Sequence, residues 1–105
     1  MSAPLTPESA PRAWDLVEIA ARNGWGVAWK PGADVNGAPY VEIVTARDGV
    51  EHRAVWHTRR KDGSQRNPAL FSAMTRRRGT PDRPGRGWHD TTLKAITASI
   101  RGEDA

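Results

Sequence analysis

Arginine is the residue type whose grouping in this sequence most directly suggests a chemical role. Basic side chains and one tryptophan cluster in the second half of the chain: Arg59, Arg60, Lys61, Arg76, Arg77, Arg78, Arg83, Arg86 and Trp88. A guanidinium group binds phosphate through paired N–H donors, and an indole ring stacks on nucleobases. We therefore expect these residues to bind DNA or RNA, with phosphate contacts from the basic side chains, and we expect the seven arginines to share one continuous surface. Trp88 suits either a stacking residue or an anchor for the loop before it.

The charge of the chain is unevenly distributed, which strengthens this expectation. The 105-residue chain has a formal net charge of +4, but residues 1–50 carry a net −2 and residues 51–105 a net +6. Between residues 53 and 86, ten basic side chains accompany only Asp62 and Asp82. Such asymmetry is typical of a protein with a polyanionic partner. Codon usage in a GC-rich genome would explain why arginine outnumbers lysine, but it explains the clustering poorly.

The segment Arg83-Pro84-Gly85-Arg86-Gly87 resembles the AT-hook, a minor-groove motif in which arginines flank glycine and proline. The usual order in that motif is Pro-Arg-Gly-Arg-Pro. Extended Arg/Gly segments fit a narrow groove because they lack bulky side chains, while the guanidinium groups seek its negative potential. The resemblance implies minor-groove contacts by Arg83 and Arg86, and the simpler alternative is a solvated loop. Arg76–Arg78 also has a structural alternative, because basic residues complement the dipole at a helix C-terminus.

No arrangement of residues points to catalysis. The histidines, His52, His57 and His89, have no metal-ligand spacing and no carboxylate cluster beside them. Gly24-Trp25-Gly26 lacks the third glycine of a phosphate-binding loop and leads into a strand instead of a helix. Cysteine is absent, which excludes disulfides and thiolate metal sites. We therefore assign no catalytic residue, metal ligand or cofactor, and we favour a protein without enzymatic activity.

The first half of the chain alternates between helical and strand-like patterns. Apolar side chains recur at helical spacing at Trp14, Val17 and Ala21, and Asn23-Gly24 is a helix stop signal. Residues 25–29 then alternate between apolar and other types, as a strand does. These patterns predict a helix followed by the first strand of a sheet.

The dipeptide Asp48-Gly49 separates residues 40–47 from residues 50–59, which are two further strand-like segments. Both central residues of a type I′ turn need a positive φ, which aspartate and glycine tolerate, and such a turn fixes the register. The pairs expected on the buried face are Arg47 with Val50, Thr45 with His52, Ile43 with Ala54 and Val41 with Trp56. The opposite face, where His57 pairs with Tyr40, is expected to be solvated or to bind a partner. The sequence thus predicts an α+β fold built on a three-stranded antiparallel meander.

One or two C-terminal helices are expected after the meander. Asn67-Pro68 is typical of a helix start, and the apolar stripe of Leu70, Phe71 and Met74 predicts a short helix. Residues 76–88 follow as a basic Arg/Pro/Gly loop. The last helix is expected to be capped by Asp90 or Thr91 and to stop at Gly102.

We expect one domain, residues 12–102, with a disordered lead-in of residues 1–11 and a tail of residues 103–105. Four tryptophans, at positions 14, 25, 29 and 56, fall where periodicity assigns the core.

The order helix, three antiparallel strands, helix resembles the double-stranded-RNA-binding-domain-like fold, and within it the HicA-type mRNA interferases. In that family the first helix ends in glycine and an aromatic residue, here Gly24-Trp25. The resemblance covers residues 12–60 and 90–101 and implies a nucleic-acid-binding surface. The family's catalytic Gly-Ser-His would fall near Gly37-Ala38-Pro39, where it is absent, so the ribonuclease activity is not carried over. Residues 61–89 have no counterpart in the family.

The favoured hypothesis is a small basic protein that binds nucleic acid without catalysis, in a regulatory role. The composition is similar to that of small proteins from actinobacterial phages and prophages. The alternative is a module that binds a host or partner protein, because arginine and tryptophan also dominate protein interfaces. A third hypothesis is a small HicA-like nuclease. The sequence has neither a signal peptide nor the roughly 20 apolar residues that span a bilayer, so we expect a cytoplasmic protein without a membrane partner.

Overall fold

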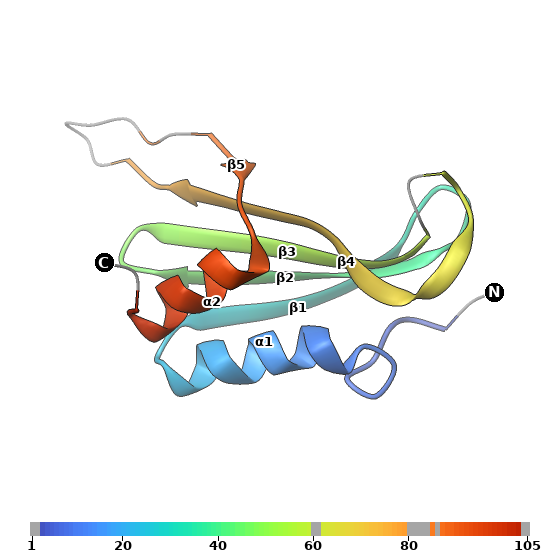
Figure 1. Cartoon of the computed structure of the whole chain (residues 1–105), viewed down its shortest axis with the longest axis horizontal. Helices are drawn as coiled ribbons and strands as arrows, with labels where there is room; N and C mark the ends of the chain where they lie inside the picture. Colours follow the sequence, from blue (N-terminus) through green and yellow to red (C-terminus); the bar gives the residue numbers. More distant parts are fainter. Residues whose placement is uncertain (1–2, 60–61, 80–84, 86, 104–105) are drawn as a thin grey trace.

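Both helices of the protein lie on one face of a five-stranded antiparallel sheet (Figure 1). The computed structural model describes residues 3–59, 62–79, 85 and 87–103. In chain order the elements are α1 (Pro11–Arg22), β1 (Gly26–Ala33), β2 (Pro39–Arg47), β3 (Val50–Arg59), β4 (Gln65–Arg77), β5 (His89–Asp90) and α2 (Leu93–Arg101). Each strand pairs with the next along the chain. The α+β class and the antiparallel meander are confirmed, and the sheet has two strands more than expected.

The β2–β3 hairpin has the predicted turn and the predicted register. Asp48 and Gly49 adopt positive φ angles of 50° and 80°. Every pair of the expected register forms, from the turn to the far end of the hairpin. The buried face is also the predicted one, since four of its side chains are at most 2 % exposed: Val41, Ile43, Ala54 and Trp56.

The hydrophobic core lies between this face of the sheet and the apolar stripes of the two helices. Trp56 is the largest of the fully buried side chains. Trp14, Trp25 and Trp29 pack against the core and are partly buried. The rings of Trp14 and Trp29 meet edge to face, with centroids 5.6 Å apart. The expected packing role of these four tryptophans is confirmed, but three of them keep part of their surface in solvent.

The prediction of a short helix after Asn67-Pro68 is wrong, because these residues belong to β4. The apolar stripe of Leu70, Phe71 and Met74 spans little more than one helical turn, so it favours a helix only weakly. β3 is a buried strand, and the N–H and C=O groups on its outer side need hydrogen-bond partners. β4 supplies that partner and places Ala73 against the core, opposite Ala54. Pro68 lies where the β3–β4 register shifts, so its missing N–H is tolerated. Figure 1 shows β4 curling strongly at this end.

The ends of both helices follow local chemistry. α1 begins with Pro11, whose fixed φ suits the first helical position. α2 is capped by the Thr92 hydroxyl, which accepts a hydrogen bond from the Ala95 amide at 3.1 Å. The cap expected at Asp90 or Thr91 therefore lies further along the chain, because Asp90 pairs in β5. Neither helix, over the described residues, has the length and apolar character needed to cross a bilayer.

The segment before α1, expected as a disordered lead-in, packs against the core in its described part. Leu5 is 6 % exposed and Ala10 is 2 % exposed. The Thr6 amide donates to Ser9 Oγ at 2.8 Å, and the Ser9 amide donates to the Thr6 carbonyl oxygen at 3.1 Å, which closes a turn. Leu5 is a single apolar residue among small and polar ones, so no periodic pattern marks it as buried.

Thr45 lies in the core with its hydroxyl unpaired. The residue is 1 % exposed, and Oγ1 has no hydrogen-bond partner within the described part of the chain. Burying an unpaired hydroxyl costs roughly 1–3 kcal/mol in proteins. We predict that Thr45→Val, a change of nearly equal shape, raises the free energy of unfolding by about 1 kcal/mol, measured by urea denaturation. Ile43→Val on the same face is the control and should lower it by roughly 0.5–1.5 kcal/mol. A less stable Thr45→Val protein would mean that the hydroxyl has a partner in solution.

Candidate nucleic-acid interface

Three arginines meet at the end of the sheet that carries the β2–β3 turn. Arg47 pairs with Val50, and Val50 pairs with Arg77, so the two arginines lie on one face of the sheet, two strands apart. At roughly 4.8 Å per strand, their backbones are about 10 Å apart. Arg101, in the last turn of α2, lines the same open groove. We name it the arginine groove; its lining includes Asn23, Trp25, Arg47, Arg77, Ser99 and Arg101.

The arginine groove keeps most of its positive charge. Arg47 donates to the Asn23 carbonyl oxygen at 2.7 Å and lies 3.5 Å from the carboxylate of Asp48, which also lines the groove. Arg77 and Arg101 are exposed, and no carboxylate among the described residues forms an ion pair with either. Other arginines are paired with carboxylates: Arg22, Arg53, Arg59, Arg76 and Arg78. The groove therefore presents two guanidinium groups that no carboxylate within the described part of the chain pairs with.

Trp25 brings an indole ring to the arginine groove, and the buried His52 lies behind it. Their ring centroids are 5.3 Å apart and the ring planes differ by 27°. His52 Nδ1 is 3.0 Å from Thr75 Oγ1, and Nε2 is 3.0 Å from Ser99 Oγ. The Thr75 hydroxyl donates to the Glu51 carbonyl oxygen at 3.1 Å, so it accepts from His52 and Nδ1 carries the proton. Nε2 is in hydrogen-bond contact with the Ser99 hydroxyl, so the imidazole that supports Trp25 is held at both nitrogens.

Glu51 holds two arginines on the opposite face of β3 and β4. Its side chain is 7 % exposed; Arg76 Nη2 lies 3.2 Å from Oε1, and Arg78 Nε donates to the same oxygen. The hydrogen bond from Arg78 is the main cause that lowers the pKa of Glu51; the contact with Arg76 adds to it, and burial opposes both. The Arg76 guanidinium also lies over the Trp88 ring, 4.5 Å from its centroid. Two arginines share one carboxylate, so positive charge also remains on this face of the sheet, opposite the face of the arginine groove.

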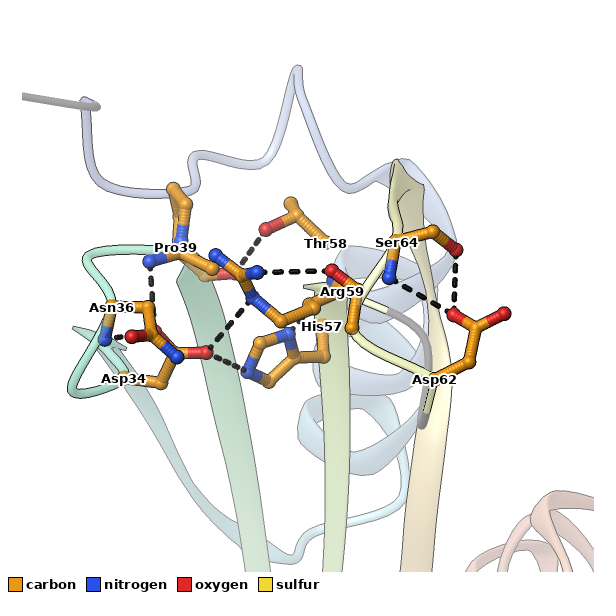
Figure 2. Close-up of polar contacts among 10 residues, drawn as sticks. Asp34, Asn36, Pro39, His57, Thr58, Arg59, Asp62 and Ser64 are labelled. Carbon is orange, nitrogen blue, oxygen red and sulfur yellow. Dashed lines mark hydrogen bonds and ion pairs between the residues drawn. The ribbon is translucent and has the colours of Figure 1, made fainter.

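Arg59 lies at the other end of β3, in a separate polar cluster (Figure 2). Its Nε is 3.4 Å from Asp34 Oδ2, and Nη1 donates to the Gly63 carbonyl oxygen at 2.9 Å. Asp34 also lies 3.5 Å from His57 Nε2. The pKa of Asp34 is lowered mainly by the hydrogen bond from the Ala38 amide. The charges of Arg59 and His57 lower it by less. Arg59 thus joins the β1–β2 loop to the end of β3, which is a structural role.

The structure groups some of the predicted site residues and separates others. Arg76, Arg77 and Arg78 line a second shallow pocket, Trp88 lies against Arg76, and of these four residues Arg77 also lines the arginine groove. Arg59 is nine residues beyond Val50, about 30 Å along an extended strand, so the described residues do not share the single continuous surface expected. Arg60, Lys61, Arg83 and Arg86 lie outside the described residues, and with them most of the AT-hook-like segment.

Arg76 and Arg77 belong to β4, so neither the expected helix end nor the dipole explanation applies to them. The basic loop accordingly begins after them instead of at residue 76. Arg47, Arg101 and Trp25 line the arginine groove, although the sequence pattern does not mark them as binding residues. The turn register already pairs Arg47 with Val50, but Arg77 joins this row only once β4 is known to be a strand.

The lowered pKa of Glu51 predicts a pH-dependent contribution to stability. The ion pairs stabilise the fold fully above the ordinary carboxyl pKa of 4.5, and this contribution is lost as the pH falls through the lower folded-state pKa. We predict that Glu51→Gln lowers the free energy of unfolding at pH 7 by roughly 1.5–3 kcal/mol, the range for a hydrogen bond to a charged group. The difference from the unmodified protein should shrink below pH 4.5.

Glu18→Gln is the matched control, because Glu18 and Arg22 form an exposed pair on α1. It should change the unfolding free energy by at most about 0.5 kcal/mol. Urea denaturation of both variants across this pH range gives the comparison. An equal effect of Glu51→Gln at acid and neutral pH would contradict the assignment of its stabilisation to the ionised carboxylate.

Among the described residues, no group of three His, Asp or Glu side chains is placed so that it could hold a metal ion. Comparison with protein-family models, with curated proteins and with solved structures found no match. The function is therefore argued from the arginine groove itself.

Proposed function

We propose that this protein binds nucleic acid without catalysis, and that the arginine groove contacts the phosphates. The observation that carries the proposal is the convergence of Arg47, Arg77 and Arg101 around Trp25, with no carboxylate ion-paired to Arg77 or Arg101 among the described residues. Arginines that lie on one surface without carboxylate partners repel one another, and this repulsion destabilises the fold. A bound polyanion relieves the repulsion. Guanidinium groups match phosphate geometry through two parallel hydrogen bonds.

Further basic residues remain proposed contacts outside the groove. Arg76 and Arg78 are held by the single carboxylate of Glu51 on the opposite face of β3 and β4, so positive charge is left there for additional phosphates. Arg60, Lys61, Arg83 and Arg86 remain proposed contacts on the strength of their position in the basic half of the sequence. The resemblance in element order to the double-stranded-RNA-binding-domain-like fold is a further reason to propose a nucleic-acid partner, although β4 falls in the segment without a counterpart.

The histidine environments favour binding over catalysis. Both ring nitrogens of His52 are engaged by hydroxyl groups inside the protein. His57 Nδ1 accepts from the Arg59 amide at 2.9 Å, and Nε2 faces Asp34. A general acid or base needs a nitrogen within reach of the substrate, and these two side chains use theirs to hold the fold.

Salt dependence gives the direct test. Each phosphate contact releases condensed counterions, so log affinity for duplex DNA falls with log salt at a slope of roughly −0.9 per contact. We predict that replacing Arg77 and Arg101 together by alanine flattens this slope by about two and weakens binding at low salt. Fluorescence anisotropy with labelled DNA and RNA, titrated between about 50 and 200 mM salt, measures both effects.

The matched control is the double replacement of Arg12 and Lys30 by alanine. It removes the same charge from exposed positions in the first turn of α1 and late in β1, outside the arginine groove. It should leave the slope within about 0.5 of the unmodified protein, since no phosphate contact is lost. Equal losses in the two double variants would reduce the proposal to a general charge effect. If the folded protein shifts no nucleic acid at low salt, the proposal fails and a protein partner becomes the leading alternative.

A further inference from the structure

We infer that the arginine groove accepts an unpaired nucleotide, whose base stacks against Trp25 while its flanking phosphates contact Arg77 and Arg101. This inference rests on the proposed function and makes it more specific, because it names single-stranded nucleic acid as the partner. It combines two features of one surface: an aromatic ring and the arginine side chains that line the same groove. A base stacked on an aromatic side chain, beside a basic groove that follows the backbone, is how single strands are bound.

Trp25 differs from the other tryptophans in its surroundings. Trp56 is 2 % exposed, and the rings of Trp14 and Trp29 contact each other. Trp88 lies beneath the Arg76 guanidinium. Trp25 is partly buried, lines the arginine groove and stacks with His52 on its inner side. Its ring is therefore supported by the protein and borders a cationic surface.

His52 makes the Trp25 ring a rigid platform. Its imidazole is fixed by Thr75 of β4 and Ser99 of α2, each at 3.0 Å. A ring that is already held in place loses little freedom when a base stacks on it, which lowers the entropic cost of binding. Ser99 also lines the groove. The helix α2 therefore positions both Ser99, which holds the His52 ring against Trp25, and the nearby Arg101.

The size of the groove suits a single nucleotide. Its volume is about 410 Å³, within the roughly 300–1,000 Å³ of small-molecule sites. In a duplex the faces of the bases are covered by their neighbours, so a protein reaches only edges and phosphates. An unpaired base exposes its face and can be splayed out onto an aromatic side chain. Stacking on Trp25 would therefore favour single strands over duplexes with the same number of phosphate contacts.

The test compares Trp25→Leu and Trp25→Phe on a short labelled single strand and on the duplex of the same sequence. Stacking on an aromatic side chain is worth roughly 1–3 kcal/mol per base, so Trp25→Leu should weaken single-strand binding about tenfold. Duplex affinity should change by less than about twofold, because its phosphate contacts remain. Trp25→Phe keeps an aromatic face and should stay within about threefold of the unmodified protein on single strands. Thermal unfolding establishes that each variant is folded at the temperature of the titration.

Trp14→Leu is the matched control, since Trp14 is also partly buried against the core but lies in the first turn of α1. It should leave the preference for single strands unchanged. A second readout is independent of stability: single-strand binding should quench tryptophan fluorescence in Trp14→Phe but much less in Trp25→Phe. Retained quenching in Trp25→Phe would overturn the inference.

The two proposals fail in different ways. If the Arg77 and Arg101 double variant loses binding while Trp25→Leu binds both nucleic acids normally, phosphate binding stands and base stacking is refuted. If Trp25→Leu weakens single-strand and duplex binding equally, Trp25 acts through the shape of the groove, and the inference is also refuted. If neither nucleic acid binds the folded protein, both proposals are refuted together.

Discussion

The positive φ angles at Asp48 and Gly49 set the register of β2 against β3, and with it the face on which each side chain of this hairpin lies. A two-residue turn permits one register, and a slip by one residue would move each side chain to the other face of the sheet. The same register that buries Ile43 and Trp56 places Arg47 on the face of the arginine groove. The groove therefore cannot shift without exposing the core, and the hydrophobic effect indirectly keeps the arginines where they are.

His52 connects this core to the surface. It extends from β3, contacts β4 through Thr75 and α2 through Ser99, and stacks on Trp25 just before β1. Such a contact ties together elements far apart in the sequence, and Arg101 follows Ser99 by two residues on α2. The last turn of that short helix is thus held against the sheet by polar contacts as well as by its apolar stripe. A buried polar network with both nitrogens satisfied also specifies one arrangement of the surrounding elements.

Local patterns along the sequence are sufficient to predict the first helix and the hairpin. The helix stop signal, the alternation of apolar residues and the turn dipeptide all indicate the same elements. They failed at Asn67-Pro68, where a local helix signal competed with the need of β3 for a second neighbour, which no local pattern reports. That error hid the site as well. Without β4, Arg77 has no place in the row with Arg47, and its neighbours are explained as the end of a helix. Periodicity places Trp25 in the core, and its contact with His52 agrees, but the sequence does not show that Trp25 lines a groove together with residues of α2.

The irregular half of β4 has a consequence for how the protein behaves at high concentration. Within the described residues β5 covers only Met74 and Thr75, so the part of β4 around Pro68 is an outer edge of the sheet. An open edge invites strands from other molecules to extend the ladder into aggregates. Pro68 offers no N–H there, and the register shifts bend the strand out of line. On the opposite edge β1 carries Lys30 and Pro31, so both borders of the sheet resist the addition of a foreign strand.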